Sequence, residues 1–386
     1  MNGQKPLKIM FSAGEPSGDL HGARLAEAIR SISPEAELIG FGGDKMQGAG
    51  VRLIEHLREY SVMGIWAVLK NLRKILRLMS LLTETMERER PDVLVIIDYP
   101  DFNWRLAKRA RALGIKVFSY SPPSAWAWRK GRAKKCGALA DELCALYPFE
   151  TPVYEKAGAN IKFLGNPLVD TVVPDLTEEE GRKFFGITEE MRPVLLLPGS
   201  RSHEIELLLP VMLGAAVKLA EAKPQTHFFL PVAQGRSEAE MIPLVEKVGL
   251  RDRITFTHEH TYDLMGLAEF AIATSGTVVM EAALRNLPCV VLYRFGALAA
   301  FIGRLVVHID NFSLPNILLG EKLQTELLQD DVNPEKIFAE AMLLYRDGER
   351  HDYVKARLRD AVAELGTPGA ANRIAEEIVA CARSNR

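Results

Sequence analysis

The sequence predicts an α/β protein made of two successive βα domains followed by C-terminal helices. Short apolar runs of strand length alternate with amphipathic segments, a pattern typical of parallel sheets that are covered by helices on both faces. The pattern pauses once, at the acidic and proline-containing stretch 170–181, and then starts again. A length of 386 residues suits about two domains, each large enough to bury its own core.

The apolar runs are expected to form strands and the amphipathic segments helices. In the first half the expected strands are Leu7–Ala13, Val93–Ile97, Ile115–Ser119 and Leu143–Leu146, with helices at Leu20–Arg30, Trp66–Arg88 and Trp104–Leu113. In the second half the expected strands are Val194–Leu197, His227–Leu230, Ile254–Phe256, Ala268–Ala273 and Cys289–Leu292. We therefore expect domains at residues 1–168 and 169–345. Terminal helices at 346–386 would pack back on the first domain or on a partner protomer of a homodimer.

The composition is that of an ordinary globular protein, with 48% hydrophobic and 25% charged residues. The 48 Lys and Arg residues nearly balance the 50 Asp and Glu residues, so no global positive field attracts nucleic acid, and we expect no nucleic-acid partner. The four cysteines form no CxxC pair and are too few for a disulfide framework. They indicate core residues in a reducing compartment.

The segment Ile65–Leu82 is the strongest candidate for contact with a membrane surface. Its apolar residues recur at helical spacing, and four basic but no acidic residues lie among them. Such a helix can bury its apolar face in the interfacial layer while its cations meet anionic head groups. The alternative is an ordinary core stripe. The charges exclude a membrane-spanning helix. The residues expected to contact the membrane are Val68, Leu69, Leu72, Ile75 and Leu76.

Two loops that follow first-half strands carry carboxylates suited to acid–base chemistry. The string Ser12–Asp19 follows the first strand, and its glycines allow close approach of a ligand; the alternative is a tight turn capped by Asp19. Asp98 ends another strand, and a buried Asp at such a place can act as a general base. The alternative is that Asp101 caps the following helix while Asp98 only bonds the turn. We expect Asp98 to be catalytic and Asp101 or Asn103 to have a structural role. Glu15 and Asp19 are further catalytic candidates.

Two helix openings rich in small residues suit a nucleotide diphosphate. Leu197–Arg201 follows a strand and opens a helix, so free N–H groups and the Arg201 guanidinium could bind phosphate. Ala273–Thr277 repeats this arrangement, and Glu281 one turn later could accept hydrogen bonds from ribose hydroxyls. Either string alone would also suit ordinary helix capping. The expected nucleotide-binding residues are Gly199, Ser200, Arg201, Ser275, Gly276, Thr277 and Glu281.

Signals for metal and covalent chemistry are weak. His258-Glu259-His260 has no evident third ligand, and HExxH is absent. No GxSxG string is present, which disfavours an α/β-hydrolase. The absence of GxGxxG and GxxxxGK[ST] weakens the dinucleotide and P-loop interpretations. We expect neither a metal ion nor a cofactor.

Several strings occur in the order found in lipid-A-disaccharide synthases, and the sequence resembles that family from Lys8 to about Gln329. The resemblance implies a GT-B fold, in which two Rossmann-like domains face a cleft. Two positions depart from the family pattern: Pro122 stands where a small polar residue is expected, and Asn166 where His is expected. The strings are Ser12–Asp19, Val62–Gly64, Ile97–Asn103, Trp126–Arg129, Leu197–Arg201, Ser275–Thr277 and Ser313–Asn316.

The resemblance implies an inverting, metal-independent glycosyltransferase. It would join UDP-2,3-diacylglucosamine to 2,3-diacylglucosamine 1-phosphate (lipid X) through a β-1,6 bond and release UDP. Asp98 would take the proton of the acceptor 6-hydroxyl, near Glu15 and Asp19. The second domain would hold UDP, and Asn316 would orient the diphosphate or the acceptor. Acylated substrates imply a cytoplasmic protein held peripherally on the inner membrane of a Gram-negative bacterium.

Other functions remain open. A UDP-N-acetylglucosamine transferase of peptidoglycan synthesis or a UDP-sugar epimerase would share the nucleotide site, but those families lack the string Trp126-Ala127-Trp128. A non-catalytic membrane protein that senses UDP-sugars would not need carboxylates at the ends of strands. A nicotinamide-dependent oxidoreductase is disfavoured because GxGxxG is absent.

Overall fold

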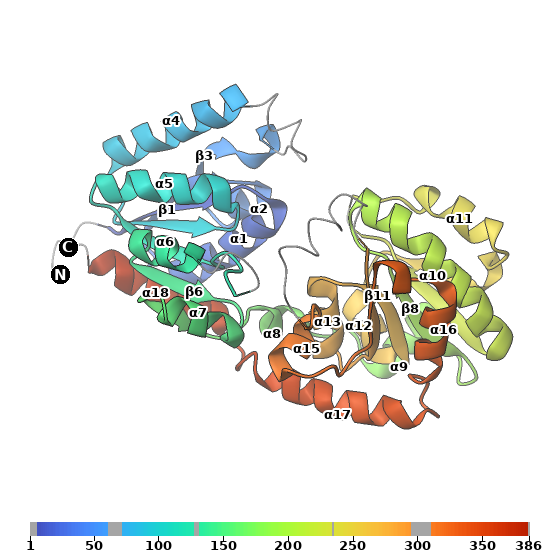
Figure 1. Ribbon diagram of the computed structural model, residues 1–386. Coiled ribbons are helices and arrows are strands. Elements are labelled where there is room, and N and C mark those ends of the chain that lie inside the picture. The colour runs from blue at the N-terminus through green and yellow to red at the C-terminus, as the bar shows by residue number, and fades with distance from the viewer. Residues whose placement is uncertain (1–5, 61–71, 127–130, 234, 295–309, 385–386) are drawn as a thin grey trace. The chain divides into compact units, whose positions relative to one another are not determined.

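The computed structural model describes residues 6–60, 72–126, 131–233, 235–294 and 310–384 (Figure 1). The chain forms two compact units. The first unit contains the chain up to Pro167 together with everything from Thr367 onward, and the second unit is Leu168–Gly366. Each unit has its own parallel sheet covered by helices.

The sheet of the first unit has seven parallel strands in the order β3-β2-β1-β4-β5-β6-β7. The chain builds outward from β1 on one side and then starts again with β4 on the other side, which is the doubly wound arrangement of Rossmann-like domains. The strands are β1 (Lys8–Ala13), β2 (Glu37–Gly42), β3 (Arg52–His56), β4 (Val93–Ile97), β5 (Lys116–Tyr120), β6 (Glu142–Ala145) and β7 (Ile161–Phe163).

The sheet of the second unit repeats this plan with six parallel strands in the order β10-β9-β8-β11-β12-β13. The strands are β8 (Arg192–Leu197), β9 (Thr226–Pro231), β10 (Ile254–Thr257), β11 (Phe270–Thr274), β12 (Cys289–Tyr293) and β13 (Glu326–Leu328). Its helices are α8 (Leu168–Thr171), α9 (Glu178–Phe185), α10 (Ser202–Ala222), α11 (Ile242–Lys247), α12 (Thr261–Leu267), α13 (Thr277–Leu284), α15 (Leu314–Leu319), α16 (Pro334–Met342) and α17 (Glu349–Ala363).

The reversal of strand order positions the functional loops in each unit. Ligands of doubly wound sheets bind at the carboxyl ends of the two strands that flank the reversal. Ala13 at the end of β1 is paired with Ile97 at the end of β4. In the second unit Leu197 of β8 is paired with Ala273 of β11. The loops that follow these residues are therefore neighbours within each unit.

Alternate side chains of the first sheet enter two separate cores, because successive residues of a strand point to opposite faces. Ile9 and Phe11 of β1 pack with α1 and α18 on one face. Met10 packs with α4 and α5 on the other. Burial on both faces explains why the strands read as continuous apolar runs. The helices of this unit are α1 (Pro16–Ile32), α2 (Asp44–Gly48), α4 (Leu72–Glu89), α5 (Pro100–Ala112), α6 (Gly131–Leu139), α7 (Thr151–Glu155) and α18 (Ala370–Arg383).

The last helix returns to the first unit. Ile374 and Ile378 of α18 are 0% exposed and belong to the core beside α1. Lys162 of β7 forms an ion pair with Glu377 at 2.6 Å. Figure 1 shows α18, in red, among the blue and green elements of the first unit. The tail 346–386 is thus divided: α17 belongs to the second unit and α18 to the first.

Each expected strand overlaps an observed one, and the structure adds β2, β3, β7 and β13. The added strands are short or interrupted: β2 contains Gly40, and β7 and β13 have three residues each.

The helix expected at Trp66–Arg88 is present from Leu72 onward, and residues 66–71 lie outside the described residues. In the part of the chain that the structure describes, no helix is both long and apolar enough to cross a bilayer.

Candidate active site

Asp98 lies in an unusual turn at the carboxyl end of β4. Its φ is +47° and that of Tyr99 is +48°, so two consecutive non-glycine residues adopt the left-handed conformation. Residues with a Cβ atom avoid this conformation unless the surrounding structure holds them in it. Tyr99 leads directly into α5 as its N-cap residue. Backbone strain of this kind clusters at functional sites, so the turn itself marks Asp98 as a functional candidate.

The buried side chain of Asn103 holds this turn. Its amide group donates hydrogen bonds to the carbonyl oxygens of Ser12 (3.1 Å), Ile97 (3.1 Å) and Asp98 (2.7 Å). Its amide oxygen accepts a hydrogen bond from the Ser12 hydroxyl at 2.7 Å. Asn103 is 0% exposed, so the loss of these bonds would leave buried groups unpaired. One side chain therefore ties the ends of β1 and β4 together and fixes the backbone at Asp98.

Gly14 in the loop after β1 leaves room for the Tyr99 ring. A Cβ atom at position 14 would clash with the Cδ1 and Cγ atoms of that ring. The same ring packs against Phe102, with 5.4 Å between the ring centroids. The loop after β1 is thus shaped to fit the strained turn after β4.

A cavity of about 270 Å³ opens at Asp98 and is lined also by Trp104, Ser121 and Arg132. Burial, and then the negative charge of Glu15, raise the pKa of Asp98 from 3.8 to about 6, while a hydrogen bond from Ser121 opposes the rise. At neutral pH this carboxylate is ionised, yet it binds a proton more tightly than an ordinary Asp. It is therefore suited to accept a proton from a hydroxyl group in the cavity.

Asp19 does not lie at this cavity. It is 5% exposed, and both of its carboxylate oxygens accept hydrogen bonds from the backbone at the start of α2. The structure therefore favours the capping alternative, although the capped helix is α2 and not the helix that contains Asp19. The donors are the N–H groups of Gly43 (2.7 Å), Lys45 (3.1 Å) and Met46 (3.1 Å).

Glu15 and Asp101 lie at the surface near Asp98. Glu15 is exposed and acts on Asp98 through its charge. Asp101 lies in the first turn of α5 with its side chain 92% exposed, 3.6 Å from Arg132. The N-cap of α5 is Tyr99, so Asp101 does not cap this helix. Of the two residues expected to be structural, Asn103 is the one that holds the turn.

Several polar groups around the Asp98 site belong to no sequence motif. The Tyr120 hydroxyl lies 3.1 Å from His21 Nδ1. Burial, and then the charge of Arg24, lower the pKa of His21 to about 4, so the ring is neutral at physiological pH. Burial raises the pKa of Glu150 to about 7, and the charge of Asp98 adds to that rise. Besides the charged side chains of Glu15 and Arg132, Asp98 therefore has neutral or weakly acidic groups near it.

A second cavity, of about 710 Å³, lies entirely within the second unit. The loops that follow β8, β9, β10 and β11 line it, so it occupies the carboxyl edge of the sheet. Its volume suits a ligand the size of a nucleotide. The structure brings all seven expected nucleotide-binding residues to this cavity: Gly199, Ser200, Arg201, Ser275, Gly276, Thr277 and Glu281.

The loop after β8 presents backbone and a guanidinium group to the cavity. Gly199 has a φ of +111°, and a Cβ atom there would clash with Glu204. Arg201 is paired with Glu204 at 3.0 Å, but its side chain is 60% exposed and so can reach an anionic ligand. Arg236, which no motif marked, donates a hydrogen bond to the Ser200 carbonyl at 3.1 Å and steadies the loop.

The loop after β11 places the start of α13 at the same cavity, with Gly276 as the N-cap residue. The first N–H groups of a helix carry partial positive charge and bind anions. Burial raises the pKa of Glu281, while a hydrogen bond from Tyr262 opposes the rise. Glu281 therefore offers a partly desolvated acceptor for hydroxyl groups beside the anion-binding loops.

Asn316 does not line this cavity. It is 0% exposed, and its amide group donates to the Gln324 carbonyl and to Glu326 Oε1, both at 2.9 Å. Glu326 also accepts the N–H of Phe312, whose carbonyl oxygen accepts the Ser275 hydroxyl at 3.3 Å. Asn316 is therefore connected to the cavity indirectly: it binds Glu326, which holds Phe312, and Phe312 in turn binds the Ser275 hydroxyl.

Comparison with known proteins identifies the family. A family model described as lipid-A-disaccharide synthetase matches residues 9–380. A lipid-A-disaccharide synthase from Geobacter sulfurreducens is 39% identical over 368 residues, which cover 95% of each chain. The chain belongs to the lipid-A-disaccharide synthase family. Another synthase of this family, from Nitrosococcus oceani, is 38% identical over 98% of this chain and 97% of its own. The chain is thus an enzyme, a glycosyltransferase of lipid A biosynthesis.

Solved structures confirm the GT-B type of fold that is expected for a lipid-A-disaccharide synthase. A UDP-GlcNAc 2-epimerase from Neisseria meningitidis, bound to UDP-GlcNAc, has a TM-score of 0.65 at 12% identity and covers 97% of this chain and 100% of its own. A glycosyltransferase from Rickettsia africae has a TM-score of 0.58 at 15% identity and covers 97% and 99%. At these identities the likeness concerns the fold alone.

Replacement of Asp98 by Asn is expected to abolish most of the synthase activity. The same replacement is expected to raise the free energy of unfolding at pH 8. A folded-state pKa above the unfolded value means that ionisation of Asp98 opposes folding as the pH rises through about 6. Asn removes this penalty and is better tolerated in the left-handed conformation. Urea unfolding at pH 8 should show a gain of about 1–3 kcal/mol that shrinks toward pH 4.

The wild-type pH–rate profile provides the companion measurement. If Asp98 accepts the hydroxyl proton, activity should fall about tenfold per pH unit below about pH 6, because the protonated carboxyl can accept no further proton. A profile that stays flat down to pH 4.5, or an Asn variant within tenfold of wild type, would remove Asp98 from the role of base.

Replacement of Asn103 by Ala is expected to cost about 2–4 kcal/mol of stability, because it leaves buried carbonyl groups unpaired. It should also lower the pH at which activity is lost, since Asp98 would no longer be held in its buried position. Asn160, an exposed residue whose amide group donates to the Asp141 carbonyl at 3.0 Å, provides the matched control, and its Ala variant should leave both measurements nearly unchanged. An unaltered pH profile in the Asn103 variant would show that Asn103 does not position Asp98.

Proposed function

We propose that the enzyme condenses UDP-2,3-diacylglucosamine with 2,3-diacylglucosamine 1-phosphate (lipid X), forms the β-1,6-linked disaccharide 1-phosphate and releases UDP. The observation that carries this proposal is the raised pKa of Asp98 in a cavity at the strand-order reversal of the first unit. Family membership supports the choice of substrates.

In the proposed step Asp98 is the general base. The 6-hydroxyl of the acceptor loses its proton to the Asp98 carboxylate, and its oxygen forms a bond to the anomeric carbon of the donor. The bond from that carbon to the diphosphate oxygen breaks on the opposite side, so the configuration is inverted. A pKa of about 6 supports this role because the group is ionised at neutral pH and still basic enough to share the proton. The step requires the two units to bring the bound substrates together.

The second unit is proposed to bind the UDP part of the donor. The diphosphate would lie at the starts of α10 and α13, whose N–H groups favour negative charge. Arg201 would neutralise the charge that develops on the leaving UDP, and Glu281 would bind the ribose hydroxyls. These residues stabilise the leaving group without a metal ion in the reacting centre.

Incubation with the two diacylated substrates tests the proposal directly. Mass analysis of the product should show a disaccharide 1-phosphate formed in equal amount with UDP, and the anomeric proton of the new linkage should have the coupling of a β-glycoside. The Asp98→Asn protein, which retains the nucleotide cavity, is the matched control and should still bind UDP. An epimerised UDP-sugar, or transfer only to a lipid-pyrophosphate acceptor, would contradict the proposal.

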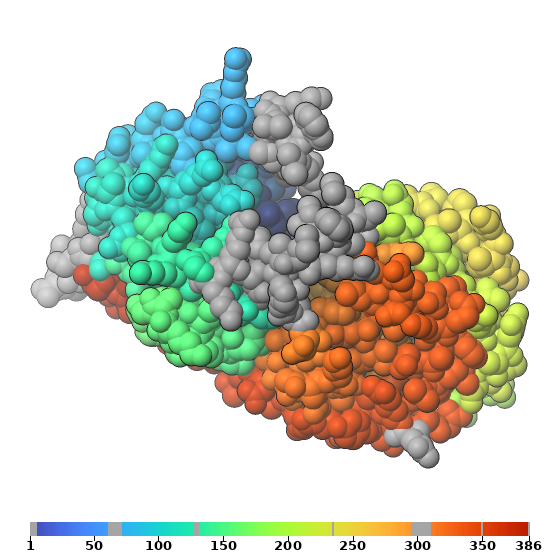
Figure 2. Space-filling model, in the orientation of Figure 1, coloured from blue at the N-terminus to red at the C-terminus, as the bar shows by residue number. Residues whose placement is uncertain are grey.

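We further propose that the N-terminal end of α4 rests on the cytoplasmic leaflet of the inner membrane. Leu72 and Leu76 are 47% and 53% exposed, and the basic residues Arg73, Lys74 and Arg77 beside them are exposed too. Figure 2 shows α4, in light blue, at the surface of the first unit. An exposed apolar and basic helix end suits a surface of anionic lipid, and the proposed substrates carry acyl chains.

The expectation that Val68, Leu69, Leu72, Ile75 and Leu76 all contact the membrane is corrected by the structure of α4. Ile75 is partly buried against the core of the first unit, and from Leu78 onward the inward side chains are core residues. Val68 and Leu69 lie outside the described residues. The core-stripe alternative therefore holds for the C-terminal part of the helix, and the membrane proposal rests on Leu72 and Leu76.

A double variant with Ser at Leu72 and Leu76 is expected to bind phosphatidylglycerol-containing vesicles about tenfold more weakly, because two exposed apolar side chains no longer enter the interface. Its melting temperature should stay within about 2 °C of wild type, since both side chains are already exposed. Leu343→Ser, which changes a 47% exposed leucine of the second unit, is the matched control. Equal vesicle binding by the double variant and the control would contradict membrane contact at α4.

A further inference from the structure

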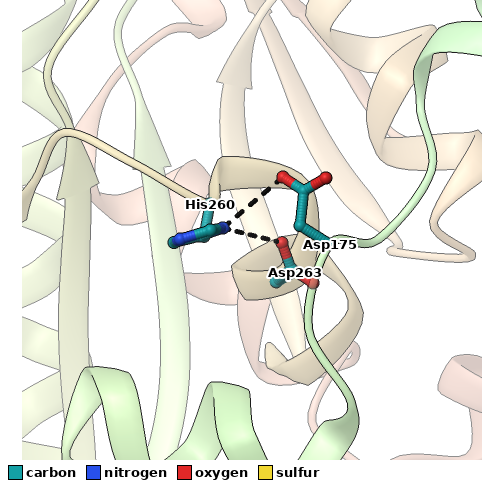
Figure 3. Close-up of side chains that lie close together, drawn as sticks. All are labelled: Asp175, His260 and Asp263. Atoms are coloured by element: carbon teal, nitrogen blue, oxygen red, sulfur yellow. Dashed lines mark ion pairs between the residues drawn. The ribbon is translucent and has the colours of Figure 1, made fainter.

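Three side chains of the second unit converge on one point beside the nucleotide-sized cavity (Figure 3). Asp175 comes from the segment between α8 and α9, His260 immediately precedes α12, and Asp263 lies in the first turn of α12. His260 Nδ1 is 3.5 Å from Asp175 Oδ2 and 3.6 Å from Asp263 Oδ2. Figure 3 shows both carboxylates on the Nδ1 side of the ring. Asp175 and His260 also line the cavity.

Two of the converging atoms are buried and have no hydrogen-bond partner among the residues that the structure describes. Asp263 has a side chain that is 3% exposed; its Oδ1 accepts the Leu176 N–H at 2.7 Å, but its Oδ2 accepts nothing. His260 Nδ1 is likewise inaccessible and makes no hydrogen bond. A buried carboxylate oxygen without a donor is costly unless a positive charge satisfies it. Oδ2 and Nδ1 lie close together, yet they are too far apart to form a hydrogen bond with each other.

We propose that Asp175, His260 and Asp263 form a binding site for a divalent transition-metal ion of the zinc type. One imidazole nitrogen and two carboxylate oxygens are ligands that Zn²⁺ accepts, whereas Ca²⁺ and Mg²⁺ prefer oxygen alone. Ligand atoms about 2.0–2.1 Å from a tetrahedral ion lie about 3.3–3.4 Å apart. The two distances from Nδ1 are near this spacing, and all three atoms lie within 4.8 Å of one another. Asp175 is exposed and can rotate to complete the set.

The surroundings of the site support ligation. The Leu176 N–H orients the Asp263 carboxylate through Oδ1, the kind of support that ligating carboxylates receive in metal proteins. The ring of Phe184 packs edge-on against the His260 ring, with 5.0 Å between the centroids, which restricts its orientation. Three protein ligands would leave a fourth coordination position for water.

His258 is not part of this site, although it forms an HxH pair with His260. Its Nε2 is paired with Glu238 Oε1 at 2.6 Å. The structure instead gives His260 the two carboxylates of Asp175 and Asp263. The ion would fasten the segment before α9 to the start of α12 and would take no part in glycosyl transfer, so the inference does not depend on the proposed reaction.

Titration of the tag-free full-length protein with Zn²⁺ against a chromophoric chelator tests this inference. The expected result is one ion per chain, with binding weakened at least about tenfold in Asp263→Asn and in His260→Asn. Both variants are expected to keep the fold. The amide oxygen introduced by Asp263→Asn can still accept the Leu176 N–H, and Asn tolerates the left-handed φ of +54° at position 260. His258→Asn is the control and should bind Zn²⁺ as wild type does.

A second measurement tests the same site by the effect of Zn²⁺ on the melting temperature. Zn²⁺ should raise the melting temperature of the wild type and of His258→Asn but not of the other two variants, because an ion that binds only the folded chain stabilises it. Mg²⁺ at the same concentration should have no such effect. Equal Zn²⁺ affinity in all four proteins, or no stoichiometric binding by the wild type, would overturn the inference.

Discussion

The Asp98 site of the first unit depends on holding two consecutive non-glycine residues in the left-handed conformation at the end of β4. Asp98 and Tyr99 cannot remain there by local preference, so the buried amide of Asn103 fixes the carbonyl groups around them. The same constraint accounts for Gly14, which leaves space for the Tyr99 ring. A turn that relaxed toward the extended conformation would carry the Asp98 carboxylate away from its cavity and toward water, and its pKa would return toward that of an ordinary Asp.

The two units share one sheet topology but differ in the charge that their sites favour. In the first unit, burial and a neighbouring negative charge make a carboxylate hold a proton more tightly. In the second unit, the starts of α10 and α13 and the guanidinium of Arg201 make a region that favours anions. Both sites lie where strand order reverses, so the fold fixes their place while a few loop residues decide their chemistry.

The two doubly wound units, their order along the chain and the residues that line the nucleotide-sized cavity could be predicted from the sequence, because strand ends and small-residue helix openings are local signals. The partner of Asp19 could not be predicted, because the helix that it caps begins at Asp44, far from it in sequence. The Asn316 side chain is likewise committed to Gln324 and Glu326, partners that only the folded structure reveals. Arg236, His21 and the carboxylates beside His260 belong to no motif, and their importance arises from tertiary contacts alone.

The return of α18 to the first unit makes the chain pass between the two units twice, at 167–168 and again at 366–367. During synthesis on the ribosome, the strands of the first sheet emerge before the second unit, but the apolar face that Ile374 and Ile378 cover stays open until α18 leaves the exit tunnel. The second unit, whose residues are contiguous, can complete its core first. A nascent chain of this protein therefore exposes an apolar, aggregation-prone sheet face while the second unit is being translated. A premature stop near residue 366 would leave that face uncovered permanently.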